Sequence, residues 1–256
     1  MTVPGSPSRR TFLAAALGSA CTALLTGCDA LSKTQWFPKL LETGEHLNRT
    51  AQRLLTSRKS MAQEFSEADL SPEFRSNGTD YPEDPAYRAL AANQFADWAL
   101  RVDGLVNRPS DFSLARLRGM RSRTQITRHD CVEGWSAIGK WTGVPLSEVL
   151  AVVQPQPQAR YVVFYCADIM EDGARYYESV DLDDAYHPQT ILAYALNGRT
   201  LPIANGAPLR VRIERQLGYK MAKYVMRIEL VETFKTVADG QGGYWEDRGY
   251  EWYAGI

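Results

Sequence analysis

The chain has 256 residues, of which 45% are hydrophobic and 23% are charged, with 29 basic and 30 acidic side chains. This length and apolar content are enough for one substantial buried core. The formal net charge is −1 and no basic run is present. The sequence therefore lacks the electrostatic footprint of a nucleic-acid-binding protein, and we expect no nucleic-acid partner.

The N-terminal residues have the features of an export signal. Arg9-Arg10 precedes an apolar stretch over residues 13–25 that is too short for an ordinary membrane helix. A twin-arginine signal exports proteins, and it carries them across already folded. The stretch ends in Leu25-Thr26-Gly27-Cys28, which resembles the lipobox of bacterial lipoproteins. We expect removal of residues 1–27, a lipid anchor on Cys28 and a place on the periplasmic side of the inner membrane; a cleaved protein without the lipid is the alternative.

Residues 28–70 are predicted to be a tether that carries an amphipathic helix. Leucines recur there at roughly helical spacing among charged residues: Leu40, Leu41, Leu47, Leu54 and Leu55. Ser71-Pro72 ends this pattern. We therefore place the folded domain over residues 71–256.

The domain is predicted to contain many short strands and few helices, which defines an α+β fold. Apolar residues alternate from Trp98 to Asp103, as in a strand, and we expect helices over Ser110–Arg118 and Pro145–Val153. Further strands are expected over residues 124–128, 161–165, 174–182, 209–214 and 223–231. The aromatic segment that begins at Gly240 is expected to dock on the domain.

Two cysteines fall within this domain, Cys131 and Cys166. In an oxidising compartment two such residues commonly form a disulfide, which would make both structural. Alternatively, Cys131 lies at the end of a strand near cationic side chains, where a thiol of lowered pKa serves as a metal ligand or nucleophile. The residues alone leave these alternatives open.

Several longer motifs occur in order along the domain. They are Cys131-Val132-Glu133-Gly134-Trp135-Ser136 with Trp141-Thr142-Gly143-Val144-Pro145-Leu146, then Leu196-Asn197-Gly198-Arg199-Thr200-Leu201-Pro202 with Asn205-Gly206-Ala207-Pro208-Leu209-Arg210, and finally Gly218-Tyr219-Lys220-Met221-Ala222-Lys223. With these motifs the chain resembles the bacterial branch of the sulfite-oxidase family, which includes methionine-sulfoxide reductases. The resemblance extends from about Asn77 to the C-terminus.

The resemblance implies a sulfite-oxidase molybdopterin-binding fold and a cofactor of molybdenum with a single molybdopterin in the monophosphate form. Cys131 would be the sole protein ligand to the metal. Tyr250 falls at the spacing of the family's active-site tyrosine and would hydrogen-bond the substrate, although an aromatic that packs the tail is an equal alternative. The following residues fall where the family contacts the pterin and its phosphate: Asn77, Asp80, Tyr81, Cys166, Asn205, Arg210, Met221, Ala222 and Lys223.

The family's activity is two-electron oxygen-atom transfer on a small-molecule substrate. Sulfite oxidases carry arginines after the metal cysteine, whereas this chain has Trp135-Ser136-Ala137, and Ser76 stands where a second substrate arginine occurs, with Arg75 beside it. We therefore favour reduction of an S-oxide or N-oxide over sulfite-type oxidation. Because no haem or iron–sulfur motif is present, we expect a separate redox partner, a membrane haem protein or a cytochrome. A non-catalytic lipoprotein with a Cys131–Cys166 disulfide, or a pterin-binding scaffold without turnover, is the alternative.

Overall fold

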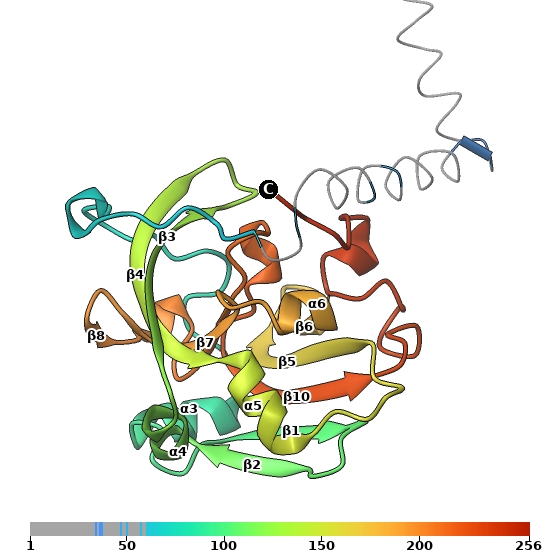
Figure 1. The fold of residues 1–256 in the computed structure, drawn as a ribbon, viewed down its shortest axis with the longest axis horizontal. Coiled ribbons are helices and arrows are strands. Elements are labelled where there is room, and N and C mark those ends of the chain that lie inside the picture. The colour runs from blue at the N-terminus through green and yellow to red at the C-terminus, as the bar shows by residue number, and fades with distance from the viewer. Residues whose placement is uncertain (1–33, 35, 38–46, 48–49, 51–56, 58–59) are drawn as a thin grey trace, which may run out of the picture. The chain divides into compact units, whose positions relative to one another are not determined.

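The structure is a computed structural model that describes residues 34, 36–37, 47, 50, 57 and 60–256. The export signal, Cys28 and the leucine stripe apart from Leu47 lie outside the described residues. A compact unit extends over Thr56–Ile256 (Figure 1), so it includes residues that the sequence assigns to the tether. Phe65 shows this, because its N–H donates to the carbonyl oxygen of Ile126 at 2.9 Å. No helix in the described part of the chain is both long and apolar enough to cross a membrane.

One sheet of the unit has the strand order β2-β1-β10-β5-β6 (Figure 1). β1 and β10 are parallel, with Val102 opposite Ile228, and the other pairs are antiparallel. Because a parallel pair needs a long crossover, most of the domain lies between these two neighbours. The strands are β1 (Ala99–Gly104), β2 (Ser110–Ser113), β5 (Tyr161–Ile169), β6 (Arg175–Asp181) and β10 (Val225–Val231).

A second sheet has the order β3-β4-β7-β8, with β9 paired to β7, and all its pairs are antiparallel. β3 and β4 form a hairpin, and Cys131 lies in the connection between them. The strands are β3 (Arg123–Asp130), β4 (Ser136–Pro145), β7 (Ile191–Leu196), β8 (Arg199–Thr200) and β9 (Arg210–Arg212).

The helices of the unit are short. α5 buries one stripe at the spacing of an amphipathic helix, formed by Leu146, Val149, Leu150 and Val153. The α-helices are α3 (Pro85–Ala92), α4 (Leu114–Gly119), α5 (Leu146–Val153) and α6 (Leu182–Ala185). The 3-10 turns are η1 (Glu67–Asp69), η2 (Ile203–Asn205), η3 (Gly218–Lys220) and η4 (Glu246–Arg248).

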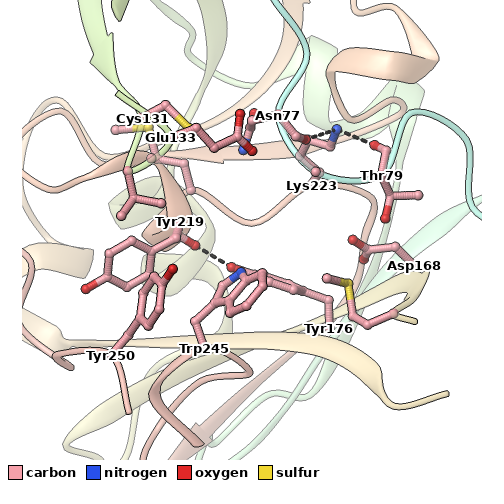
Figure 2. Close-up of a pocket in the computed structure, with 15 residues that line it drawn as sticks. Asn77, Thr79, Cys131, Glu133, Asp168, Tyr176, Tyr219, Lys223, Trp245 and Tyr250 are labelled. Carbon is pink, nitrogen blue, oxygen red and sulfur yellow. Dashed lines mark hydrogen bonds between the residues drawn. The ribbon is translucent and has the colours of Figure 1, made fainter. Parts of the chain in front are cut away.

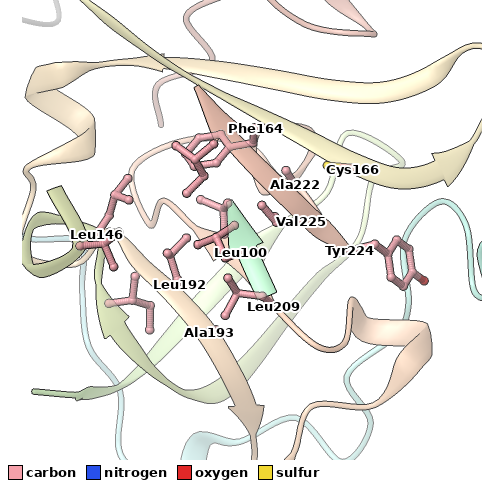
Figure 3. Packing of buried hydrophobic residues seen from close by; sticks show 14 of the residues in the cluster. Leu100, Leu146, Phe164, Cys166, Leu192, Ala193, Leu209, Ala222, Tyr224 and Val225 are labelled. Carbon is pink, nitrogen blue, oxygen red and sulfur yellow. The ribbon is translucent and has the colours of Figure 1, made fainter. Parts of the chain in front are cut away.

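A continuous hydrophobic core joins side chains of both sheets and of α5 (Figure 3). Leu100, Phe164 and Leu192 are fully buried in it. Cys166 and Ala222, which the resemblance places at a cofactor, belong to this same core.

The expected α+β class, with mixed short strands and few helices, is confirmed. The helix expected over Ser110–Arg118 is wrong in its first half, which forms β2. Phe112 is buried there opposite Leu100 of β1, and this burial favours a strand. α4 begins only at Leu114, where the Ser113 hydroxyl caps it by accepting from the Arg116 N–H at 3.1 Å. The C-terminal segment is docked as expected, with Tyr244 buried and Trp252 stacked on Phe234.

Candidate functional site

A cavity of about 170 Å³ brings together residues from distant parts of the chain (Figure 2). Cys131 and Glu133 lie at one end of the view and Asp168 at the other, with Asn77 and Lys223 along one side and aromatic rings along the opposite side. The cavity is lined by Asn77, Gly78, Thr79, Cys131, Val132, Glu133, Asp168, Met170, Tyr176, Gly218, Tyr219, Met221, Lys223, Trp245 and Tyr250.

Cys131 is held in a tight turn directly after β3. Its N–H donates to the carbonyl oxygen of Trp135 at 2.9 Å, and its own carbonyl oxygen accepts from the Gly134 N–H at 3.0 Å. Gly134 has a φ of 86°, which a residue with a side chain adopts only with strain. The turn therefore presents a buried, unpaired thiol to the cavity.

Burial raises the pKa of the Cys131 thiol, and the charge of Glu133 acts in the same direction, while Arg210 lowers it. The sequence-based expectation of a lowered pKa is therefore wrong for the thiol itself, because the loss of hydration outweighs the neighbouring cation. A metal would reverse this preference, because coordination deprotonates a thiol outright.

Two buried cations, Arg210 and Lys223, lie at the cavity and form no ion pair with a carboxylate in the part of the chain that the structure describes. Arg210 donates from Nη1 to the Asn205 carbonyl oxygen at 3.2 Å and from Nη2 to Asn77 Oδ1 at 3.0 Å. Lys223 Nζ donates to the carbonyl oxygens of Asn77 and Ala204, both at 2.7 Å. Burial lowers the pKa of Arg210 to about 9, and the nearby charge of Arg212 acts in the same direction. Burial also lowers the pKa of Lys223 to about 7, and there the charge of Arg210 is the second cause.

Other buried cations of the domain are paired differently. Arg212 contacts Glu214 at 2.6 Å, and Lys220 contacts both Glu178 and Glu246. Arg210 and Lys223 have no such ion pair within the described residues, and Arg210 Nε has no hydrogen-bond partner there. Buried charge is costly unless it is compensated. The two cations therefore fit a phosphate-bearing ligand, and the Cys131 thiol in the same cavity fits a metal.

Gly206 explains how Arg210 and Lys223 come together. It ends η2 with a φ of 109°, a conformation that favours glycine. A Cβ at this position would lie 3.0 Å from Lys223 Cβ and 3.2 Å from Arg210 Cβ. The Asn205-Gly206 motif thus turns the chain and lets both cations approach one backbone.

Aromatic rings form the opposite wall. Tyr250 stacks on Trp245 with ring centroids 5.2 Å apart and meets Tyr219 edge-on at 5.3 Å. Tyr250 is 39% exposed. Tyr176 donates from its hydroxyl to the Tyr219 carbonyl oxygen. This wall offers apolar and polarisable surface to a bound molecule.

The structure brings part of the predicted site together. Five of the predicted residues line the cavity: Cys131, Tyr250, Asn77, Met221 and Lys223. Arg210 and Asn205 lie behind it, in contact with each other.

The other predicted cofactor residues do not line the cavity. The side chains of Cys166 and Ala222 are in the core. Asp80 is also absent from the lining, and Tyr81 is 42% exposed with its ring against Tyr87. A cofactor contact from Cys166 or Ala222 would therefore come from the main chain.

Sequence reasoning missed two acidic residues of the cavity, Glu133 and Asp168. Burial raises the pKa of Asp168 to about 7, and its Oδ1 has no partner among the described residues. Glu133 lies within the cysteine motif, where an acidic residue two positions from a ligand could have drawn attention. Asp168 gave no such signal, because one acidic residue near the end of a strand is ordinary.

The sequence gives His129 no metal-binding spacing and suggests an ordinary surface or capping histidine, which is wrong about its burial. Its side chain is fully buried, and its Nδ1 accepts from Arg212 Nη1 at 2.9 Å. This contact joins β3 to β9 just before Cys131. His129 therefore has a structural role in the strand that leads to the cysteine.

The disulfide alternative is wrong for this structure. Cys131 and Cys166 are both free thiols; one faces the cavity and the other packs in the core.

A buried thiol in the cavity and two buried cations beside it, which form no ion pair in the described part of the chain, are the features of a cofactor-binding domain on this α+β fold. The family model for the oxidoreductase molybdopterin binding domain matches residues 88–237, more than half of the chain. The chain therefore belongs to this family of molybdopterin-dependent oxidoreductases.

Curated relatives support the same assignment. The chain is 36% identical to the putative protein-methionine-sulfoxide reductase subunit YedZ1 of Azospira oryzae, over 97% of this chain and 88% of the relative. It is 32% identical to the protein-methionine-sulfoxide reductase catalytic subunit MsrP of Pseudomonas syringae pv. tomato, over 93% and 77%. The MsrP of Xanthomonas axonopodis pv. citri is 39% identical over 63% of this chain, which spans about half (52%) of that relative. The sulfane dehydrogenase SoxCD of Paracoccus pantotrophus is a solved structure with 22% identity and a TM-score of 0.49, over 54% of this chain and 39% of that one.

Proposed function

We propose that this domain reduces an S-oxide by oxygen-atom transfer at a molybdenum centre bound through Cys131. The observation that carries the proposal is the shared cavity of the Cys131 thiol and the buried cation Lys223, with Arg210 behind it. When bound, the molybdenum–pterin group supplies the two-electron couple. The overall change is that an S-oxide takes up two electrons and two protons and leaves as the sulfide and water.

The protein residues bind and orient the reactants. Arg210 and Lys223 would hold the pterin phosphate, because a guanidinium fork and an ammonium suit phosphate oxygens. We propose the monophosphate form of the pterin. Asn77 orients Arg210 through its side-chain oxygen. Met221 and the main chain near Cys166, Asn205 and Ala222 line the cofactor, and Tyr250 donates a hydrogen bond to the substrate oxygen.

The charge of the cavity favours a neutral substrate. Lys223 is the one cation among the described lining residues, against the acids Glu133 and Asp168, and the opposite wall is aromatic. Sulfite, a small anion, would need a positive clamp. An S-oxide brings a polar oxygen and apolar substituents, and its sulfur suits contact with aromatic rings. The names of the relatives point to the same class, protein-bound methionine sulfoxide.

We extend the proposal to the protein's place in the cell. The twin-arginine signal and Cys28 support export and lipid anchoring on the periplasmic side of the inner membrane. There a membrane haem protein or a cytochrome would deliver electrons.

The test is elemental analysis and S-oxide reduction on protein matured with its own export signal. We expect about one molybdenum per chain, release of a monophosphate pterin, and sulfide formation with a chemically reduced electron donor. Cys131→Ser should lose the metal and the activity together. A Cys131→Ser protein with full molybdenum and full activity would rule out this proposal.

A further inference from the structure

A buried charge cluster lies directly behind the aromatic wall. Lys220 in η3 donates from Nζ to Oε1 of Glu178 in β6 and to Oε1 of Glu246 in η4. All three side chains are fully shielded from solvent. Residues from three separate segments are thus joined at one ammonium group.

The charge balance of this cluster is unusual. Two carboxyl groups share one cation, and burial followed by the Glu246 charge raises the pKa of Glu178. Two carboxylates that share a site do not both ionise readily. The single ammonium group of Lys220 is therefore the shared donor for both carboxyl groups.

Two of the three members of the cluster are next to a residue of the cavity wall. Tyr219 precedes Lys220 and Trp245 precedes Glu246. Tyr250 is tied to the same turn, because its N–H donates to the Trp245 carbonyl oxygen at 3.0 Å. None of the three cluster side chains lines the cavity itself, so the cluster adjoins the segments that carry the rings rather than a bound molecule.

The glycine run before the wall fits this arrangement. The Gly243 backbone passes so close to Glu178 and Glu246 that a Cβ at this position would overlap the carboxyl groups of both. The neighbouring Tyr244 N–H donates to the Tyr177 carbonyl oxygen at 3.0 Å, which fastens the segment to β6. This run, which is not part of a dinucleotide-binding motif, lets the backbone lie against the cluster.

We propose that Lys220, Glu178 and Glu246 form a positioning cluster that holds Trp245 and Tyr250 against the cavity and so sets the affinity for the substrate. This inference rests on the proposed S-oxide reduction. Apart from η4, residues 240–256 contain no helix or extended strand, so contacts with the rest of the domain give the wall its place, and the contact of Lys220 with Glu246 is a fully buried one among them.

The experiment compares two disruptive variants of the molybdenum-loaded protein with a conservative one. Lys220→Met removes the shared donor, and the double variant Glu178→Gln/Glu246→Gln leaves Lys220 buried without a counterion. Glu246→Gln alone keeps one carboxylate and replaces the other with a neutral acceptor. Val149→Ala truncates a core side chain in α5 and serves as the control for a loss of stability that leaves the cluster intact.

The readouts are steady-state kinetics with a small alkyl sulfoxide and amide hydrogen exchange over residues 243–250. For both disruptive variants we expect a KM raised by about tenfold or more, with kcat per bound molybdenum changed by less than about threefold. Amide exchange should speed up over the wall segment. Glu246→Gln and Val149→Ala should both keep the wild-type KM.

Two outcomes would overturn the inference. One is an unchanged KM and unchanged exchange in the double variant; the other is a Glu246→Gln variant as impaired as the double one. If the wild-type protein itself binds no molybdenum or reduces no S-oxide, it is the proposed function that fails. In that case hydrogen exchange still tests whether the cluster holds the wall.

Discussion

Arg210 donates a hydrogen bond from Nη2 to Oδ1 of Asn77 at 3.0 Å, across 133 positions of the sequence. The contact links β9 to the loop that lines one side of the cavity. Lys223 contacts the main chain of the same loop at Asn77. Two buried cations therefore converge on one short segment, although neither forms an ion pair within the described residues.

We expect Arg210→Met to lower the content of molybdenum and pterin per chain. The variant removes a charge-assisted contact worth about 1.5–3 kcal/mol, which is at least about tenfold in cofactor affinity. Metal and pterin are measured on exported protein, with Arg101→Met as the control because Arg101 lies on β1 and pairs with Asp103 and Asp111. Full cofactor content in Arg210→Met would contradict a phosphate-binding role.

We expect Asp168→Asn to remove a pH dependence of stability. The folded pKa of Asp168, about 7, lies above the ordinary value of 3.8, so the folded state binds the proton more tightly. The stabilisation of the folded protein by the proton on Asp168 is therefore fully present below about pH 4, and it is lost as the pH rises towards 7. Between about pH 5 and pH 8 the wild-type protein should lose about 2.6 kcal/mol of unfolding free energy relative to the variant, at about 1.4 kcal/mol per pH unit below the folded pKa.

The measurement is urea unfolding of the cofactor-free protein at both pH values. The two proteins share their other acidic groups, so the difference between them reports the Asp168 site. Parallel stability curves for wild type and variant would show that Asp168 is ionised in the fold at neutral pH.

We expect Tyr250→Phe to lower kcat/KM for an S-oxide by about tenfold, because it removes a donor to the substrate oxygen. The ring that stacks on Trp245 stays in place, so Tm should hardly change. Tyr186→Phe is the matched control, since Tyr186 is another exposed tyrosine but lies away from the cavity. Equal kinetics for the two variants would mean that Tyr250 only packs the wall.

Local signals predicted much of the fold. The alternation up to Asp103 predicted β1, and the proline before Leu146 predicted α5. The local signals predicted a helix where the structure has β2, because the burial of Phe112 against the rest of the domain decides the structure there. The parallel pairing of β1 with β10 could not be predicted, because no local pattern specifies a neighbour more than a hundred residues away.

The site was predictable only where residues carry a known motif. Cys131 and Lys223 lie in such motifs, and both line the cavity. Lys220 lies in the same motif as Lys223, yet the carboxyl groups that it contacts, those of Glu178 and Glu246, are 42 and 26 positions away in the sequence. A charged residue in a strand is normally read as facing solvent, so a buried cluster leaves no trace in the pattern of polar and apolar residues.

We expect Cys166→Ala to keep its molybdenum while losing stability. The thiol is buried in the core with Ala222 and Val225 (Figure 3), and loss of its sulfur leaves a small cavity that costs about 1–2 kcal/mol. Because the side chain does not line the site cavity, cofactor contacts through the main chain should persist. Metal analysis and urea unfolding check the two parts separately. A stable Cys166→Ala protein without molybdenum would instead show that the thiol itself contacts the cofactor.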